Sequence, residues 1–394
     1  MNLTTLNQTN TRKICILIIH GIGEQNVYET LDLFTRNLVD SLRQSRPDDE
    51  ITLTHSRAQL ADGTEDYVEV CCSHDPTVRL DVHEYYWAHN MKDVISFQEI
   101  VHWLIQASDG AEKFYEANNE LVRRYEAFED GKFKKRWYLK HLGWVLRGLY
   151  KMGLVTHGLM PAVLDPILRL FIGKPTQLLI DYLGDVAIYT SSDMKSKFYE
   201  VRQRVLQGAI QKITSLLDDD YEKIILVGHS LGSVIAYDAL NRINLSMNDN
   251  EALRRHADKL TDFISIGSPL DKVAFFFREH IPQSDYVKRL VLNNVNAFRR
   301  IDAELPAAPD VVFQSTVRDC LTSLNWTNYW DPKDPISGPL DFYKGVTNVQ
   351  VDNGQKWGYA HVGYWSNMRI FHDAVKTARI PYNGNWQTWA EQIS

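Results

Sequence analysis

An apolar run leads into a glycine-bounded serine in the stretch Lys223-Ile224-Ile225-Leu226-Val227-Gly228-His229-Ser230-Leu231-Gly232. Apolar residues at helical spacing follow, at Leu231, Val234, Ile235 and Leu240. A strand, a Gly-x-Ser-x-Gly turn and a helix in this order are typical of a nucleophile elbow, which lifts a serine hydroxyl out of a sheet. Gly228 and Gly232 leave room for so sharp a turn, because they carry no side chain that would collide with it.

The position of Ser230 in this pattern predicts a nucleophile. The following helix would bring free backbone N–H groups and its positive dipole end beside the hydroxyl, and the N–H of Leu231 is the first of these groups. His229 fills the variable position before the serine and supports the motif. The alternative is an ordinary serine in a strand-to-helix turn, and the flanking patterns favour the elbow over it.

A second strand, loop and helix open the chain. Residues 13–19 form an apolar strand pattern, His20-Gly21-Ile22-Gly23 follows, and residues 31–42 have an amphipathic helical pattern. In hydrolases with an elbow, a His-Gly loop at this place supplies a backbone N–H that pairs with the one after the nucleophile. We therefore predict Ile22 and Leu231 as the two oxyanion donors. Because His20 lies too early in the chain to be the base, we expect it to hold the loop by a hydrogen bond.

Composition limits the classes of protein that fit. The chain of 394 residues has a formal net charge of −7, which disfavours non-specific nucleic-acid binding, and a hydrophobic content of 44%, which allows a full core. Its four cysteines lack zinc-ligand spacing and the density of a disulfide framework, so a reducing compartment fits best. The first apolar run is too short for a signal peptide, and no uncharged apolar stretch reaches 18 residues. We therefore expect a cytoplasmic protein without a membrane span.

Strand and helix patterns alternate along the rest of the chain. Further strands are predicted at residues 51–55, 67–72, 79–87, 262–266, 320–330 and 346–351, and helices at 194–217 and around Phe371. Together with the elbow, the alternation predicts an α/β-hydrolase fold with a mostly parallel, doubly wound sheet and a site at the carboxyl ends of its strands. The segment before the elbow strand is far longer than one crossover needs. We therefore predict a discontinuous core of residues 12–90 and 185–390, with a helical cap inserted at 91–184.

The predicted cap contains a basic amphipathic stretch from Lys132 to Lys151, in a chain that is acidic overall. On a helix, four cations share one side, apolar side chains take the opposite side, and two tryptophans lie near the boundary. The cations are Arg136, Lys140, Arg147 and Lys151, and the tryptophans are Trp137 and Trp144. Such a helix can lie on an anionic membrane surface. The alternative, which stays open, is a helix that packs its apolar face on its own domain.

A nucleophilic serine needs a base, and the base needs an acid that fixes its tautomer. In chain order both should follow Ser230, and of the later histidines only His361 falls in a predicted loop shortly after the last predicted strand. His372 falls on the predicted terminal helix and is expected to be structural. Two carboxylates, Asp331 and Asp334, stand just after a predicted strand, where the acid belongs. Position alone does not decide between them.

A series of blocks follows one order along nearly the whole chain. They are His20-Gly21-Ile22-Gly23, Asp185-Val186 with Tyr189, Gly228 to Asp238, Gly267-Ser268-Pro269-Leu270, Asn328-Tyr329 with Asp334-Pro335, and His361 with Tyr364-Trp365. In these residues the chain resembles the DDHD-domain intracellular phospholipases and their bacterial α/β-hydrolase relatives. The resemblance implies a cytosolic lipid-ester hydrolase with Ser230, Asp334 and His361 as its triad, and it favours Asp334 over Asp331.

These patterns predict a serine hydrolase that cleaves carboxylic esters of lipids, like a phospholipase A or a lysophospholipase, through an acyl-serine intermediate. The expected partners are a lipid or acyl-ester substrate and an anionic membrane surface, without nucleic acid. No cofactor or metal is expected, because no ligand cluster demands one. Two alternatives stay open. One is a soluble carboxylesterase or thioesterase whose cap only encloses an acyl pocket, and the other is a catalytically silent scaffold that binds membranes or proteins.

Overall fold

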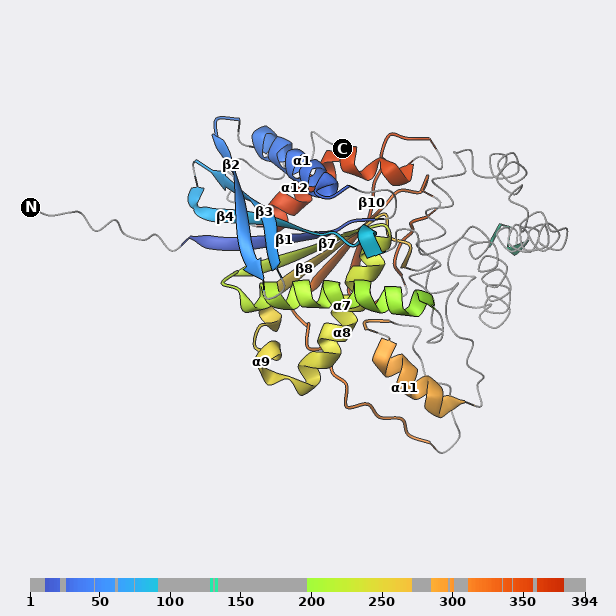
Figure 1. Ribbon diagram of the computed structural model, residues 1–394. Helices are drawn as coiled ribbons and strands as arrows, with labels where there is room; N and C mark the ends of the chain where they lie inside the picture. Colours follow the sequence, from blue (N-terminus) through green and yellow to red (C-terminus); the bar gives the residue numbers. More distant parts are fainter. Residues whose placement is uncertain are drawn as a thin grey trace, which may run out of the picture.

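The structure, a computed structural model, is an α/β protein with an eight-stranded, mostly parallel sheet (Figure 1). The residues that it describes are 11–21, 26–45, 47–60, 63–73, 75–90, 128–129, 132–133, 197–270, 285–296, 298–300, 311–334, 336–341, 343–356 and 360–378. Within these ranges, no helix is both long enough and apolar enough to cross a membrane.

The sheet has the strand order β10-β9-β8-β7-β1-β4-β3-β2. Its strands are β1 (Arg12–Ile19), β2 (Ile51–Leu60), β3 (Gly63–Cys72), β4 (Asp75–Tyr85), β7 (Lys223–His229), β8 (Leu260–Ile266), β9 (Asn325–Trp330) and β10 (Val346–Gln350). Neighbouring strands run parallel from β10 to β4, whereas β4, β3 and β2 form an antiparallel meander. The carboxyl ends of β7, β8, β9 and β10 therefore share one edge of the sheet.

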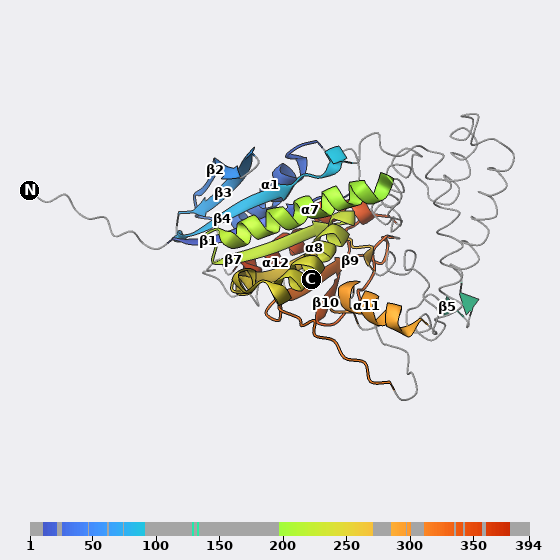
Figure 2. The ribbon, with the colours of Figure 1, turned by 60° about the horizontal axis from the view of Figure 1, so that its bottom comes forward.

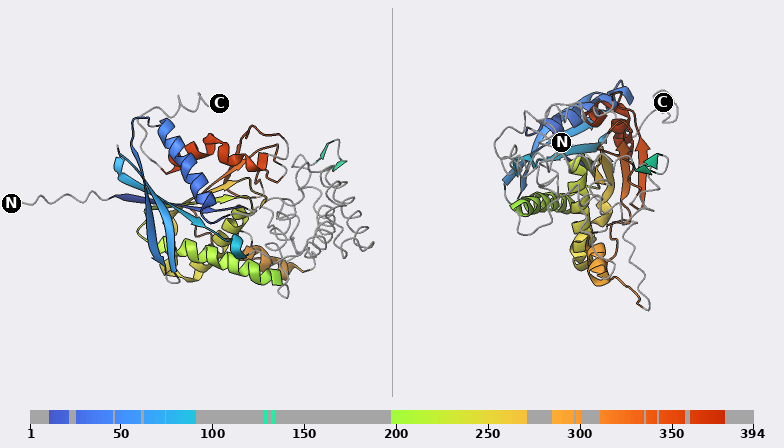
Figure 3. Two further views of the ribbon diagram at one scale, coloured as in Figure 1. Left: turned by 45° about the horizontal axis from the view of Figure 1, so that its top comes forward. Right: turned by 90° about the vertical axis from the view of Figure 1, so that its right-hand side faces the viewer.

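Helices cover both faces of the sheet (Figures 2 and 3). α1 (Glu29–Ser45) and α12 (Met368–Thr377) pack on one face, and α7 (Lys197–Asp218) and α8 (Leu231–Asp249) pack on the other. The remaining described helices are short or peripheral. They are α9 (Glu251–Arg254), α11 (Tyr286–Asn296) and the 3-10 turns η1 (Ala88–Asn90), η2 (Ala257–Lys259), η3 (Ala360–Val362) and η4 (Tyr364–Ser366).

The central strand β1 shows why both faces need helices. Successive side chains of a strand point to opposite faces, and here Ile14, Ile16 and Ile18 belong to the core under α1 and α12. The alternate residues Cys15, Leu17 and Ile19 belong to the core under α7 and α8. All six side chains are fully buried. Burial of a large aliphatic side chain contributes about 1.5–3 kcal/mol, so a continuous apolar run such as β1 is most stable where both faces are covered.

The predicted α/β class and the mostly parallel sheet are confirmed, but several predicted strand boundaries are wrong. β3 begins at Gly63 and not at residue 67, and β4 spans Asp75–Tyr85 and not residues 79–87. The strand predicted at 320–330 begins only at Asn325. The residues before it close a turn in which the Leu324 amide donates to the Leu321 carbonyl oxygen at 3.0 Å. Strand β2 continues past residue 55 to Leu60, because it pairs with β3 along its whole length.

The predicted cap at 91–184 lies outside the described residues, apart from strands β5 (Phe128–Glu129) and β6 (Lys132–Phe133). These two strands pair antiparallel, with Phe128 opposite Phe133. The prediction that a helix begins at Lys132 is therefore wrong. In the sequence, the dipeptide Asp-Gly separates the two strands, and this dipeptide favours antiparallel pairing of the residues that flank it. The candidate membrane-binding residues lie outside the described residues: Arg136, Trp137, Lys140, Trp144, Arg147 and Lys151.

Candidate active site

Ser230 stands between the end of β7 and the start of α8, in a backbone conformation that non-glycine residues rarely adopt. Its φ is 52° and its ψ is −127°, a strained combination that persists only where neighbouring contacts enforce it. The Ser230 amide donates to the Ile266 carbonyl oxygen at 2.9 Å. The amide and the hydroxyl of Ser233 both donate to the Ser230 carbonyl oxygen, at 3.0 and 2.6 Å. The turn is thus held from both sides.

Close backbone contacts explain the glycines around this serine. A Cβ atom at Gly228 would lie 2.5 Å from Ser233 Cα, and one at Gly232 would collide with the Ile19 carbonyl oxygen. A Cβ atom at Gly21 would lie 2.8 Å from Ser230 Cβ. A larger residue at any of these positions would push the elbow away from its neighbours. The contact at Gly21 also shows that the loop after β1 lies directly against the serine.

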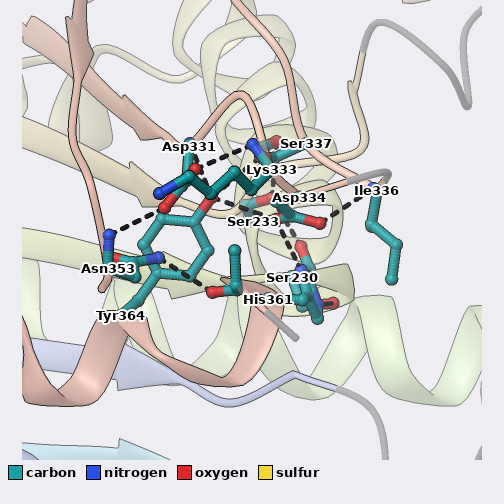
Figure 4. A network of polar contacts seen from close by, with 12 residues as sticks. Ser230, Ser233, Asp331, Lys333, Asp334, Ile336, Ser337, Asn353, His361 and Tyr364 are labelled. Carbon is teal, nitrogen blue, oxygen red and sulfur yellow. Dashed lines mark hydrogen bonds and ion pairs between the residues drawn. The ribbon is translucent and has the colours of Figure 1, made fainter. Parts of the chain in front are cut away.

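Three side chains that are distant in sequence form one hydrogen-bonded series (Figure 4). Ser230 Oγ lies 2.9 Å from His361 Nε2, and His361 Nδ1 lies 2.8 Å from Asp334 Oδ2. Because an ionised carboxylate only accepts hydrogen bonds, Nδ1 carries the imidazole proton, and Nε2 is left to accept the proton of the serine hydroxyl. This is the arrangement of a nucleophile, a base and an orienting acid.

The carboxylate of Asp334 is buried and ionised. Burial by itself raises its pKa, but the hydrogen bond and charge of His361, together with the Ile336 amide at 2.8 Å, hold the pKa of Asp334 well below its usual range. An ionised Asp334 stabilises positive charge on the imidazole. The imidazole acquires this charge when it takes a proton from a serine hydroxyl.

The parallel strand order accounts for the meeting of these residues. Ser230 follows β7, Asp334 stands in a turn after β9, and His361 lies in η3 after β10. Strands β7, β8, β9 and β10 are neighbours and run in one direction. Residues just past their carboxyl ends therefore converge at the edge where open α/β sheets bind their ligands.

The structure separates the two candidate acids. Asp331 is fully buried, and its carboxylate oxygens accept hydrogen bonds from the backbone amides of Lys333 at 2.8 Å and Asn353 at 2.7 Å. Asp331 therefore ties the turn after β9 to the segment after β10. Its neighbour Asp334 is the carboxylate that lies against His361.

Of the two predicted oxyanion donors, Leu231 lies in the part of the chain that the structure describes. Leu231 is the first residue of α8, so its backbone N–H has no acceptor within the helix and lies at the positive end of the helix dipole, next to Ser230. Ile22 lies outside the described residues. Its neighbour Gly21 is described and lies against Ser230, which places the beginning of the predicted oxyanion loop beside the serine.

His20 is bound on both ring nitrogens. Nδ1 donates to the Gly21 carbonyl oxygen at 2.7 Å, and Nε2 accepts from the Trp87 amide at 3.1 Å. The ring also stacks on the Trp87 indole, with centroids 4.9 Å apart. Burial lowers the pKa of His20 from 6.5 to about 4. His20 is thus neutral, and its hydrogen bonds to Gly21 and Trp87 hold the loop after β1 in place.

Two further residues lie against the His361 ring. His229 stacks on it, with centroids 5.3 Å apart, and burial lowers the pKa of His229 to about 3. Within the described part of the chain, neither ring nitrogen of His229 has a hydrogen-bond partner. Sequence reasoning gave no individual role to Tyr364, whose hydroxyl lies 3.0 Å from Asp334 Oδ2. Its spacing of three residues from His361 predicts proximity on a helical turn, but not contact with the acid.

Replacing His20 tests whether it is buried in its neutral form. Because its folded pKa of about 4 lies below the ordinary 6.5, unfolded chains take up the proton first as the pH falls. The contribution of His20 to stability is complete above pH 6.5 and is lost as the pH falls toward 4, at about 1.4 kcal/mol per pH unit. His20→Asn should flatten the pH dependence of the unfolding free energy by about that slope, measured by urea titration. An unchanged slope would contradict the assignment.

Two further observations concern the grouping of possible metal ligands and the similarity of the chain to known proteins. Among the described residues, no three His, Cys, Asp or Glu side chains are grouped so that they could hold a metal ion. Comparisons of the chain with protein-family models, with curated proteins and with solved structures find no match. The resemblance to the DDHD phospholipases therefore stays a prediction from motif residues, and function is inferred from the geometry of the site.

Proposed function

We propose that the chain is a serine hydrolase of carboxylic esters. The observation that carries the proposal is the hydrogen-bonded series Asp334, His361 and Ser230, with distances of 2.8 and 2.9 Å, at the start of helix α8. A serine in a strained turn, an imidazole that presents an acceptor nitrogen to it and an ionised carboxylate behind the imidazole are the groups that acyl transfer requires.

In the proposed reaction, His361 Nε2 takes the proton of the Ser230 hydroxyl while the serine oxygen attacks the ester carbonyl carbon. The Leu231 N–H and an N–H of the loop after Gly21 stabilise the negative charge that develops on the carbonyl oxygen. His361 then gives the proton to the leaving alcohol as the carbon–oxygen bond breaks, and an acyl-serine remains. Water gives a proton to the same imidazole and attacks the acyl-serine. The imidazolium returns that proton to Ser230 Oγ as the acyl–oxygen bond breaks, and the carboxylic acid leaves.

We assign the fold to the α/β-hydrolase type. The chain order Ser230, Asp334, His361 is the order of nucleophile, acid and base that is typical of this fold. The elbow strand β7 lies inside the sheet, and its neighbour β1 leads into the loop that carries Gly21. This matches the expected arrangement, in which the second oxyanion donor comes from a strand beside the elbow strand.

We propose a lipid ester as the substrate, cleaved at a cytoplasmic membrane surface in the manner of a phospholipase A or a lysophospholipase. Two observations support it: the motif resemblance, and the cationic stretch from Lys132 to Lys151 in a chain with a formal net charge of −7. Each cation near an anionic surface contributes about 1 kcal/mol. Four cations on one face would therefore contribute about 4 kcal/mol at low ionic strength, enough to hold the enzyme at its substrate.

Ser230→Ala should abolish hydrolysis of both a short soluble ester and a phospholipid. Turnover should fall by about four orders of magnitude or more, because loss of the nucleophile removes the function of the whole triad. The urea midpoint should change little, since the backbone contacts of the turn remain. Ser246→Ala is the matched control, because Ser246 is exposed farther along the same helix. Undiminished turnover in Ser230→Ala would show that Ser230 is not the nucleophile, and the proposal would be wrong.

Replacement of Asp334 should lower turnover, whereas replacement of Asp331 should lower stability. Asp334→Asn should lower turnover by about 10⁴-fold with the fold intact, because an amide cannot hold the required histidine tautomer. Asp331→Asn should lower the unfolding free energy by about 1–3 kcal/mol, because it disturbs a buried acceptor of two backbone amides. Its turnover per folded molecule should stay within about tenfold of the wild type. If Asp331→Asn lost more turnover per titrated active site than Asp334→Asn, Asp331 would be the acid of the triad.

Charge reversal in the predicted cap tests the substrate class. Replacement of Arg136, Lys140, Arg147 and Lys151 by glutamate should abolish binding to anionic vesicles and hydrolysis of their lipids. Hydrolysis of a short soluble ester should stay within about twofold, because this attraction acts only at a charged surface. Wild-type binding should also weaken steeply with salt, which screens charges beyond about 10 Å at 0.1 M.

The matched control applies the same change of charge elsewhere on the chain. It replaces four exposed arginines with glutamate: Arg36, Arg43, Arg254 and Arg255. This variant should still bind vesicles. If the cap variant bound vesicles as well as the wild type, the basic stretch would be an ordinary solvated surface. A soluble esterase or thioesterase would then be the better assignment.

A further inference from the structure

The hydroxyl of Tyr364 lies at the centre of the turn that carries the acid (Figure 4). It is 3.0 Å from Asp334 Oδ2, the same oxygen that accepts the His361 Nδ1 hydrogen bond at 2.8 Å. It is also 2.9 Å from the Asp331 amide nitrogen and 2.8 Å from Ser337 Oγ. One phenol oxygen therefore contacts the acid, the backbone of the turn and a neighbouring hydroxyl.

The hydrogen-bonding capacity of these groups fixes the direction of two of the three bonds. A backbone amide can only donate, so the Asp331 N–H donates to the phenol oxygen. An ionised carboxylate can only accept, so the single phenol proton goes to Asp334 Oδ2. The Ser337 hydroxyl lies 2.8 Å from the phenol oxygen and also hydrogen-bonds the Asp334 carboxylate, so its single proton can go to either group. The Tyr364 hydroxyl thus donates to the acid and accepts from the backbone of the turn.

The phenol ring is held as firmly as its hydroxyl. Tyr364 is fully buried, and its ring meets the His361 ring edge to face, with centroids 6.3 Å apart and planes at 90°. Gly267, at the end of β8, has a φ of 60° and makes room for this ring. A Cβ atom at Gly267 would lie 2.7 Å from Tyr364 Cε2 and 3.4 Å from His361 Cε1. The backbone of β8 therefore fixes Tyr364 against both members of the triad that it touches.

We propose that Tyr364 is the positioning residue of the triad acid and sets the pH below which the base is lost. This inference rests on the proposed hydrolase function. A second donor on Asp334 Oδ2 draws part of the negative charge away from the imidazole. It also holds the carboxylate in the rotamer that faces His361. Without the phenol, the Ile336 amide and His361 still hold the carboxylate, which then carries more of its negative charge toward the ring. His229, which stacks on the same ring, is neutral, so activity should be lost at a higher pH on the acid side.

Tyr364→Phe tests this directly, because it removes one oxygen and leaves the ring. The acid limb of the pH profile of kcat/KM for a short soluble ester should move up by about half a pH unit or more, which is about a threefold change in the imidazole protonation equilibrium. At the optimum, kcat per titrated active site should fall about tenfold with KM within about twofold, because the acid is held less firmly while the nucleophile, the base and the oxyanion donors are unchanged.

Tyr329→Phe is the matched control. Tyr329 is also buried, and its hydroxyl donates to a carboxylate, Asp373 Oδ2, at 2.8 Å, but that carboxylate belongs to α12 and not to the triad. Its pH profile and its kcat should match those of the wild type. If the Tyr364 hydroxyl only stabilised the fold, both variants would have a lower folded fraction. The acid limb of the kcat/KM profile would then stay where it is in the wild type.

A readout that does not need turnover separates this inference from the proposed function. The low-field proton resonance of the Asp334–His361 hydrogen bond reports protonation of the ring, and its titration midpoint should rise in Tyr364→Phe but not in Tyr329→Phe. Midpoints and acid limbs that coincide with the wild type in both variants would overturn the role of Tyr364. If the wild type hydrolysed no ester but the midpoint still rose, the hydrolase proposal would fail and the positioning role would stand.

Discussion

The backbone of Ser230 is the constraint on which the rest of the site depends. Its φ of 52° exists only because the chain passes within contact distance of β1 at Gly232 and is bound to β8 through the Ile266 carbonyl oxygen. Strain of this kind costs on the order of 1–3 kcal/mol. The buried strands on either side of the turn offset that cost, and they fix the serine as part of the core.

The sheet then determines where the partners of the serine come from. Because β7, β8, β9 and β10 are adjacent and parallel, the turns after β9 and β10 reach the same edge as the elbow. Asp331 and Tyr364 bind these two turns together through backbone amides and the phenol oxygen. Asp334 and His361 thus meet Ser230 with little freedom, which is the preorganisation that the proposed acyl transfer would need.

Sequence patterns predict the parts of this structure that depend on local chemistry. The elbow at Ser230, the alternation of strands and helices, and the loop position of His361 all follow from spacing and composition. Position could not rank Asp331 and Asp334, because they share one turn and differ only in which partner each carboxylate reaches. The contact of Tyr364 with the acid depends on the space left by Gly267, so no pattern in the chain could show it. The pairing of β5 with β6 was not predicted, although the Asp-Gly dipeptide between them in the sequence favours it.

The site at which a fluorophosphonate reacts with the protein shows whether Ser230 is the nucleophile. Attack by an activated serine displaces fluoride and leaves a stable phosphonyl ester, so intact-mass and peptide-mass spectrometry locate the nucleophile. An activated Ser230 should give one adduct per chain, on the peptide that contains this serine. A protein that stays unmodified, or one that is modified at another serine while the Ser230 peptide is untouched, would contradict it.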